Sequence, residues 1–213
     1  MVRNEQYEKN EVGRDFVVGD LHGCYLALEE KLEDVKFNVE TDRLFSVGDL
    51  VDRGPDNIKC LELLDQHWFH SVRGNHEQMF ADYIDGYLDS FQYHRNGGSW
   101  VEYVDRGELK KWAQRVRDLP IAITVKVDGG LIGITHAEPP HDWLYVADED
   151  YEEQLLWGRR VIRTQSFDHN VANVLRTYHG HTPLKHVVDV GNSRFIDTGA
   201  CFNGGVLTVE RIN

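Results

Sequence analysis

Phe16-Val17-Val18-Gly19-Asp20-Leu21-His22-Gly23 is the stretch from which the fold of this sequence can be inferred. Three apolar residues are followed at once by a glycine and by polar residues that can bind ligands, which is typical of a short buried strand ending in a loop. The same pattern recurs at Leu44–Asp49 and at Phe69–Asn75. The sequence therefore predicts three strands, each followed directly by glycine and polar residues.

The segments between these strands show helical periodicity. The apolar positions are Tyr25, Leu28, Leu32 and Val35 in the first segment, and Ile58, Leu61, Leu64 and Trp68 in the second. Pro55 precedes the second set, and proline is favoured in the first turn of a helix. This alternation predicts a βαβαβ unit, and open α/β sheets bind ligands at the carboxyl edge of their strands.

The second half of the chain has a different pattern. Glu77–Asp118 is mostly helical with an interruption at 96–98, and this pattern ends before Pro120, which cannot continue a helix. The strands predicted beyond it are 121–127, 131–135, 187–190, 194–196 and 206–209, and Pro139–Glu153 is predicted as an acidic loop. Together these segments predict an α/β fold of two packed mixed β-sheets, a β-sandwich, flanked by α-helices, in a single domain spanning 1–213.

Composition narrows the class of protein. With 41% hydrophobic and 28% charged residues in 213, the chain has the composition of a folded domain with a real core. It contains no apolar stretch of about 20 residues, so no membrane contact is expected. The polar segment Met1–Arg14 does not resemble a signal peptide, and we expect a cytoplasmic protein. The net charge of -13 argues against a broad nucleic-acid surface.

Candidate metal ligands lie at the predicted strand ends. Asp20 and His22 are two residues apart, so in an extended chain they point the same way and can share one ion. His136 follows the strand predicted at 131–135, and His181 lies in His-Gly-His-Thr. His179 shares a strand face with His181 and is the competing candidate.

The donor set indicates which metals fit. It comprises two carboxylates, one amide oxygen and three imidazoles, from Asp20, Asp49, Asn75, His22, His136 and His181. Mixed oxygen and nitrogen donors suit Mn, Fe or Zn better than Mg or Ca alone. Six protein ligands are too many for one ion that must also leave room for substrate, but they are sufficient for two ions bridged by Asp49. Two such ions can acidify a water molecule and stabilise an in-line displacement at phosphorus.

The order of these motifs resembles a known family. GDLHG at 19–23, GDLVDRG at 48–54, GNHE at 74–77, a lone His136 and GHT at 180–182 resemble the phosphoprotein phosphatase branch of the calcineurin-like metallophosphoesterases, which includes bacteriophage lambda protein phosphatase and its small bacterial relatives. The resemblance extends from about Phe16 to Val209, and five motifs in order make it specific. It implies the metallophosphoesterase fold.

The resemblance also implies roles for the matching residues in metal binding. Asp20, His22 and Asp49 would hold one ion. Asp49, Asn75, His136 and His181 would hold the other. Manganese is the ion that we expect first, with iron or zinc as alternatives.

Substrate binding and proton transfer have their own predicted residues. Arg53 and Arg73 would bind the phosphate oxygens together with Asn75, and Arg159 would be the third phosphate-binding arginine, with the adjacent Arg160 as the alternative. The resemblance assigns His76 as the donor of a proton to the leaving oxygen. It assigns Asp52 to the orientation of the His76 ring, and the reaction to direct attack by metal-bound hydroxide.

Three functional hypotheses remain open. The first is a serine/threonine protein phosphatase acting on a phosphoprotein or phosphopeptide, with phosphotyrosine or phosphohistidine as further substrates. The second is a diadenosine tetraphosphate (dinucleoside polyphosphate) hydrolase, a group that typically lacks an acid at the position of Asp52 and has GNHD where this chain has Glu77. The third is a binding module that keeps the fold without turnover. The oligomeric state is not predicted.

Overall fold

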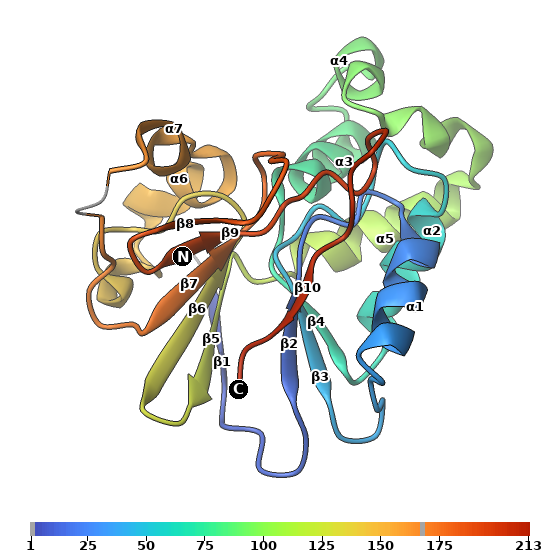
Figure 1. Cartoon of the computed structure of the whole chain (residues 1–213). Helices are drawn as coiled ribbons and strands as arrows, with labels where there is room; N and C mark the ends of the chain where they lie inside the picture. The colour runs from blue at the N-terminus through green and yellow to red at the C-terminus, as the bar shows by residue number, and fades with distance from the viewer. Residues whose placement is uncertain (1–2, 167–168) are drawn as a thin grey trace.

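Two β-sheets face each other in the structure, and helices cover their outer faces (Figure 1). The structure is a computed structural model that describes residues 3–166 and 169–213. One sheet has six strands in the order β1-β5-β6-β7-β9-β8, and the other has four in the order β10-β2-β3-β4. Strands of both directions occur in each sheet, so the predicted α/β arrangement of two mixed sheets is confirmed.

The four-stranded sheet contains the three strands that open the sequence analysis. Its strands are β2 (Asp15–Val18), β3 (Arg43–Ser46), β4 (Phe69–Ser71) and β10 (Val209–Arg211). The first three run parallel, and β10 pairs antiparallel with β2. The final strand was predicted at 206–209, and this prediction is wrong: the strand begins three residues later, at Val209. Thr198 accounts for the shift, because its hydroxyl donates to the Val206 carbonyl at 2.6 Å and holds that segment in a loop.

Most of the predicted helices lie beside this sheet or above its upper edge (Figure 1). They are α1 (Tyr25–Asp34), α2 (Asn57–Glu62), the 3-10 turn η1 (Leu63–Asp65), α3 (Asn75–Asp85), α4 (Ser90–Arg95), the 3-10 turn η2 (Gly98–Tyr103) and α5 (Arg106–Arg117). The helical pattern predicted to reach Trp68 ends at Asp65. The reason is that Gln66 takes an extended conformation and leads into β4, where Trp68 packs against Phe37.

The six-stranded sheet contains two strands outside the predicted ranges, at 4–7 and 176–179. Its strands are β1 (Asn4–Tyr7), β5 (Ala122–Val127), β6 (Gly130–Thr135), β7 (Arg176–His179), β8 (Val188–Val190) and β9 (Ser193–Phe195). Strand β1 was missed because its sequence is polar and carries no apolar run. It pairs parallel with β5 at the edge of the sheet, and its Tyr7 packs against Phe45 of the facing sheet.

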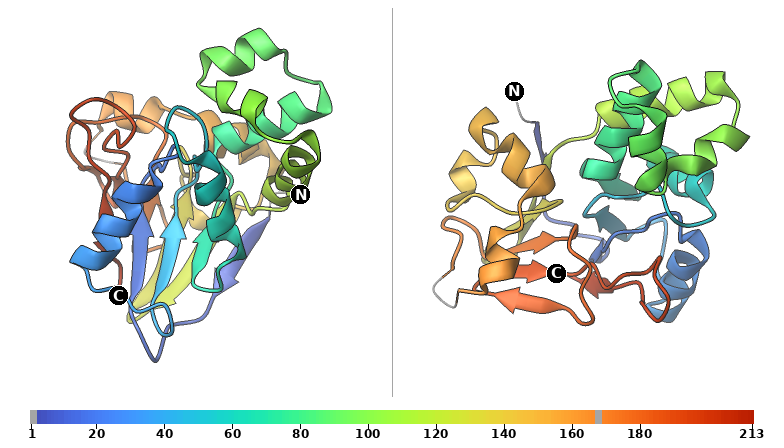
Figure 2. Two further views of the ribbon diagram at one scale, coloured as in Figure 1. Left: turned by 90° about the vertical axis from the view of Figure 1, so that its right-hand side faces the viewer. Right: turned by 90° about the horizontal axis from the view of Figure 1, so that it is seen from above.

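The segment predicted as a loop at Pro139–Glu153 contains two 3-10 turns. These are η3 (Trp143–Tyr145) and η4 (Glu149–Tyr151), followed by α6 (Glu152–Trp157) and α7 (Arg160–Thr164). Asp142 and Asp148 accept hydrogen bonds from backbone N–H groups at the start of the two turns. Some of the acidic residues here are therefore helix caps. Figure 2 shows α6 and α7 on the side of the molecule opposite α1 to α5.

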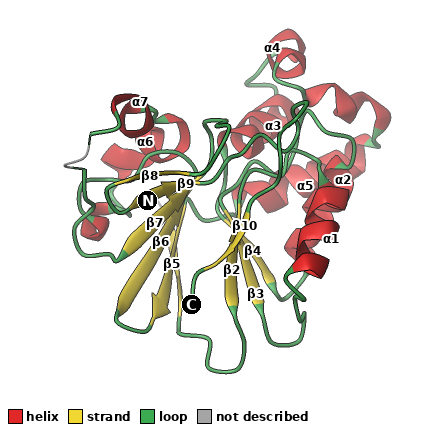
Figure 3. Ribbon diagram, in the orientation of Figure 1, coloured by secondary structure: helices red, strands yellow, loops and turns green. Residues whose placement is uncertain are grey.

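The core between the sheets places the strand ends together. Val17, Phe45, Ile123 and Ile134 belong to one buried cluster that fills the space between the two sheets. Because β2, β3 and β4 run parallel, their carboxyl ends meet at one edge, and the loop after β6 lies at the same end of the molecule (Figure 3). Within the described residues, no helix combines the length and the apolar character needed to cross a membrane.

A buried ion pair ties the entry of β2 to the loop before β3. Asp42 is 4% exposed and accepts hydrogen bonds from the backbone N–H groups of Arg14 (2.8 Å) and Asn38 (2.9 Å) and from the Arg14 guanidinium (2.5 Å). Burial alone would raise the pKa of Asp42, but these donors lower it below its ordinary value. The charged carboxylate is thus favoured by folding.

We predict that Asp42→Asn lowers the free energy of unfolding by about 2 kcal/mol at pH 7, because the amide is uncharged and has one accepting oxygen in place of the two that accept now. A carboxylate whose folded pKa is depressed stabilises the fold above its unfolded pKa of about 3.9 and ceases to do so as the pH falls below it. Urea denaturation of both proteins should therefore show a difference that shrinks in acid. The exposed Asp34→Asn is the matched control, and a loss under about 0.5 kcal/mol for Asp42→Asn contradicts the prediction.

Candidate active site

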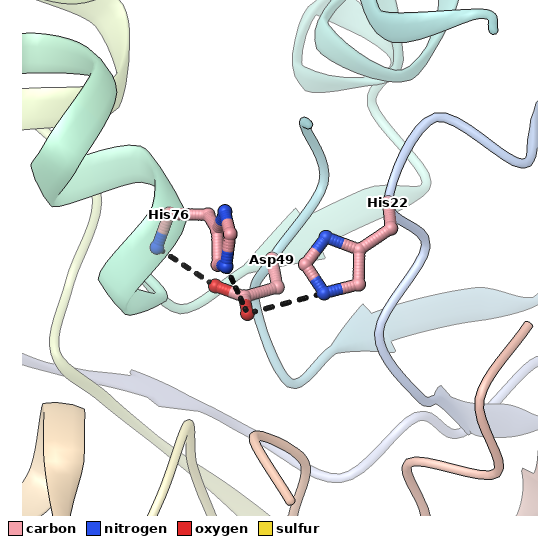
Figure 4. A group of neighbouring side chains, drawn as sticks. All are labelled: His22, Asp49 and His76. Carbon is pink, nitrogen blue, oxygen red and sulfur yellow. Dashed lines mark hydrogen bonds and ion pairs between the residues drawn. The ribbon is translucent and has the colours of Figure 1, made fainter. Parts of the chain in front are cut away.

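Asp49 lies at the centre of the loops that follow the strands. Its carboxylate is 2% exposed, and one oxygen, Oδ2, lies 3.5 Å from Nε2 of His22 and 3.9 Å from Nε2 of His76 (Figure 4). The other oxygen, Oδ1, lies 3.3 Å from Nε2 of His136 and accepts the backbone N–H of His76 at 3.0 Å. Three imidazoles from three different segments of the chain thus converge on one buried carboxylate.

These side chains form two groups that could each hold a metal ion. One is His22, Asp49 and His76, and the other is Asp49, His136 and His181. Within each group the candidate ligand atoms lie within 4.8 Å of one another. Because Asp49 belongs to both, the arrangement is that of a binuclear metal site bridged by a carboxylate.

Asn75, the first residue of α3, lies within the second group. Its Oδ1 is 2.8 Å from Nε2 of His136 and 2.8 Å from Nδ1 of His181. The structure therefore brings together Asp49, Asn75, His136 and His181, the four side chains expected around one of the two ions.

The hydrogen bonds of the histidines test whether these residues fit a metal. Nδ1 of His136 donates to the Val47 carbonyl at 2.8 Å, and Nδ1 of His22 donates to the Val51 carbonyl at 2.8 Å. A carbonyl only accepts, so in the neutral rings the Nε2 lone pairs face the oxygens of Asp49. Lone pairs that face one another in a buried site need a positive charge between them, and histidine ligands commonly donate their second N–H to a carbonyl in this way.

The electrostatics of the site favour positive charge as well. Burial lowers the pKa of His136, but the Asp49 carboxylate outweighs it and raises that pKa above its ordinary value. Burial lowers the pKa of His181 to about 3, which keeps its ring neutral, and its Nε2 is buried without a hydrogen-bond partner. A neutral imidazole with a free nitrogen beside a buried carboxylate suits a metal ion.

Asp20 lies beside these groups without belonging to either. Its carboxylate accepts the backbone N–H of His181 at 3.0 Å. Burial, and then repulsion from Asp197 and Asp49, raises the pKa of Asp20 well above its ordinary value. The three carboxylates are each at most 3% exposed, and buried negative charges of this kind require a compensating cation. The role of Asp20 as a ligand alongside His22 stays a prediction.

Asp197 supports a turn beside the site. Its Oδ1 accepts the backbone N–H of Gly199 at 2.9 Å. Burial, followed by the charge of Asp49, also raises its pKa, and Asp197 in turn raises the pKa of Asp20. The signal that could have identified it is its position directly after the apolar end of β9, the same signal that identifies Asp20 and Asp49.

Glu77 ties two of the loops together. Its carboxylate accepts the backbone N–H groups of Asp49 (2.8 Å), Leu50 (2.7 Å) and Gly74 (2.8 Å). Gly48 has φ 94°, and a Cβ there would lie 2.7 Å from the Gly74 nitrogen, so only glycine allows this approach. Glu77 thus orients its neighbours in the loops after β3 and β4.

His179 is turned away from the site. Its Nδ1 lies 2.9 Å from the Thr135 hydroxyl and its Nε2 2.7 Å from the Thr177 hydroxyl. Both ring nitrogens are therefore occupied, and burial lowers the pKa of His179 to about 3. Of the two histidines that competed as ligands, only His181 lies beside Asp49.

The predicted phosphate-binding arginines differ in their surroundings. The Arg53 guanidinium lies against His22 and His76, donating to Nε2 of His76 at 2.9 Å. Nη2 of Arg73 lies 3.4 Å from Glu152. Arg159 has a buried Nε without a partner, and burial together with the charges of Arg163 and Arg53 lowers its pKa. The charge of Arg53 acts on Arg159, so these two arginines lie near each other.

Arg160 lies in a different environment from Arg159. Its side chain is 77% exposed, and its Nη2 lies 3.4 Å from the buried carboxylate of Glu138. It is thus directed outward and paired there. Of the two neighbouring candidates for the third phosphate contact, the geometry favours Arg159.

His76, the predicted proton donor, and Asp52, predicted to orient its ring, are in direct contact. Nδ1 of His76 lies 2.6 Å from Oδ2 of Asp52, and both side chains are at most 2% exposed. Asp52 and Arg53 each have φ 73°, a left-handed conformation that residues other than glycine rarely adopt. Such strain is tolerated only where the surrounding structure enforces it, and it is common at functional sites.

Comparison with known proteins finds relatives that match over most of this chain. A protein of Salmonella typhimurium named serine/threonine-protein phosphatase 1 is 39% identical over 207 residues, covering 92% of this chain and 91% of its own length. A bis(5'-nucleosyl)-tetraphosphatase of Geobacillus thermodenitrificans is 29% identical, covering 92% and 89%. A crystal structure of a provisionally assigned diadenosine tetraphosphatase matches the fold with a TM-score of 0.67 at 20% identity, covering 99% and 98%.

A protein-family model also matches this chain. Residues 16–197, which include every loop that contributes to the site, match the model of the calcineurin-like phosphoesterases. Together with the binuclear arrangement around Asp49, this shows that the chain belongs to the calcineurin-like phosphoesterase family.

Proposed function

We propose that this phosphoesterase is a serine/threonine protein phosphatase that hydrolyses phosphate monoesters on proteins or peptides. The Asp52–His76 pair, 2.6 Å apart beside Arg53, is the observation that carries the proposal. The alkoxide that leaves phosphoserine is strongly basic, so its departure needs a proton donor. The Salmonella typhimurium relative is named for this activity, which supports the proposal. We further propose a single domain, 1–213, that acts in the cytoplasm.

Two divalent cations belong to the proposal. Asp20, His22 and Asp49 would hold one, and Asp49, Asn75, His136 and His181 the other. Manganese is the ion that we propose first, with iron or zinc as alternatives, because the donors are carboxylate, amide and imidazole without thiolate. When bound, such ions would neutralise phosphate charge and lower the pKa of a water molecule.

The arginines of the chain have the task of binding the phosphate group. Arg53, Arg73 and Arg159 would supply three guanidinium groups, and the planar fork of each matches two phosphate oxygens. The buried Nε atoms of Arg73 and Arg159 have no hydrogen-bond partner, so both retain a free donor. Asn75 adds an amide N–H beside them.

His76 has the task of moving the proton. Its Nδ1 faces the carboxylate of Asp52, which leaves Nε2, the atom on the side of Asp49 and Arg53, as the nitrogen that would exchange a proton with the leaving group. The carboxylate keeps the ring in one orientation. His76 can then donate from Nε2 to a leaving oxygen.

A diadenosine tetraphosphate hydrolase is the second candidate function. The 29% identity with the Geobacillus thermodenitrificans relative, over most of both chains, is the observation in its favour. Hydrolysis of a phosphoanhydride releases a phosphate, which leaves readily and needs little help from a proton donor. The buried Asp52–His76 pair therefore favours a substrate with a poorer leaving group.

A substrate panel decides between the two candidates. After removal of metal and reconstitution with manganese, iron or zinc, the protein should hydrolyse a phosphoserine peptide at least about 10-fold faster, in kcat/KM, than diadenosine tetraphosphate. Phosphotyrosine peptide is included to measure breadth. A preference of similar size for the dinucleotide would contradict the proposal, and inactivity toward all of them with every metal would indicate a binding module.

The proton-donor role predicts a dependence on the leaving group. His76→Asn should lower kcat on a phosphoserine peptide by about 10³-fold, within the range for general acids, but on 2,4-dinitrophenyl phosphate by less than about 10-fold. The exposed His186→Asn is the matched control and should change neither rate. Metal content is measured in parallel, since His76 lies beside Asp49. Equal losses on both substrates with metal content unchanged would exclude the role of proton donor.

A further inference from the structure

Two side chains outside the family motifs are bonded directly to Asp52. They come from the segment that forms α4 and η2, which lies at the top of the molecule in Figure 1. The Tyr93 hydroxyl donates to Oδ1 of Asp52 at 2.7 Å, and Nε1–H of Trp100 donates to the same oxygen at 2.8 Å. The motif analysis did not assign a role to either residue.

The two oxygens of the Asp52 carboxylate have different hydrogen-bond partners. Oδ1 receives Tyr93 and Trp100, whereas Oδ2 faces Nδ1 of His76 at 2.6 Å. Three partners from two sides leave the fully buried carboxylate of Asp52 a single orientation. Hydrogen bonds to a carboxylate are among the strong ones, so these three contacts hold the Asp52 side chain firmly in place.

Tyr93 is suited to be a permanent donor. Its ring is fully buried and stacks on Tyr83 with the ring centroids 4.8 Å apart. Burial and the Asp52 carboxylate raise the pKa of its hydroxyl far above the ordinary value, so the hydroxyl stays protonated.

The backbone of the same segment holds the strained pair Asp52–Arg53. The Arg53 N–H donates to the Gly97 carbonyl at 3.1 Å. A Cβ on Gly97 would lie 2.7 Å from the Arg53 nitrogen, and a Cβ on Gly98 would overlap the Tyr93 ring. The glycine turn at 96–98 is therefore what lets this segment approach the loop after β3 closely enough to bond it.

We propose that Tyr93 and Trp100 are positioning residues for proton transfer to the leaving group, an inference that rests on the proposed role of His76. They act through Asp52. By occupying Oδ1 they hold Oδ2 against Nδ1 of His76, which directs Nε2 toward the site. Their substitution should therefore lower kcat only when the leaving oxygen needs a proton.

The test is a leaving-group series on three variants. Tyr93→Phe and Trp100→Phe each remove one donor and keep an aromatic ring, and the double variant removes both. On phenyl phosphate each single variant should lose about 10-fold in kcat and the double variant about 10²-fold, while 2,4-dinitrophenyl phosphate should change less than about 2-fold. Tyr83→Phe, on the ring stacked against Tyr93, is the matched control and should leave both rates unchanged.

A double-mutant cycle separates positioning from a general structural effect. In an Asp52→Asn background, Tyr93→Phe should cost less than about 2-fold, because the carboxylate that it holds is absent. An equal loss on both phosphates, or an undiminished loss in that background, would overturn the proposal. Thermal melting checks that each variant folds. If Tyr93→Phe does not fold, the test can still be made with Trp100→Phe. Hydrolysis of aryl phosphates can be measured whether or not the natural substrate is a phosphoprotein. If phosphopeptides are not hydrolysed, the proposed function fails, but this test still applies.

Discussion

The rest of the structure depends on one buried carboxylate, that of Asp49. It belongs to both groups of candidate metal ligands and lies between imidazoles from three other segments of the chain. A charge this deeply buried is tolerated only with compensating positive charge and hydrogen bonds. The loops around Asp49 supply such interactions. Two histidines are oriented by backbone carbonyls, and Glu77 fixes the backbone of Asp49 itself.

The fold supplies the convergence on which this centre relies. Parallel strands β2, β3 and β4 deliver Asp20, Asp49 and Asn75 to one edge, and the facing sheet delivers His136 and His181. The segment with α4 and η2 then closes over the loop after β3 and holds Asp52. Metal binding, phosphate binding and proton transfer are thus assigned to different elements that meet at the same edge.

Sequence reasoning succeeded where local pattern and geometry agree. The strands before Gly19, Gly48 and Gly74 were predicted because a buried strand that stops at glycine and polar residues leaves a clear pattern. It missed β1, whose stability comes from pairing with β5 rather than from its own residues. It also missed Tyr93 and Trp100, because their importance lies in bonds to Asp52 across 41 and 48 residues, which no local pattern records.

Metal stoichiometry tests the central claim most directly. Purified protein reconstituted with manganese and freed of excess metal should contain two ions per chain by elemental analysis. The shared carboxylate predicts that Asp49→Asn reduces the content below about one ion, whereas His22→Ala and His181→Ala each lose one, since each lies in only one of the two groups. A wild-type content of one ion, or an Asp49→Asn variant that keeps both, would contradict the account.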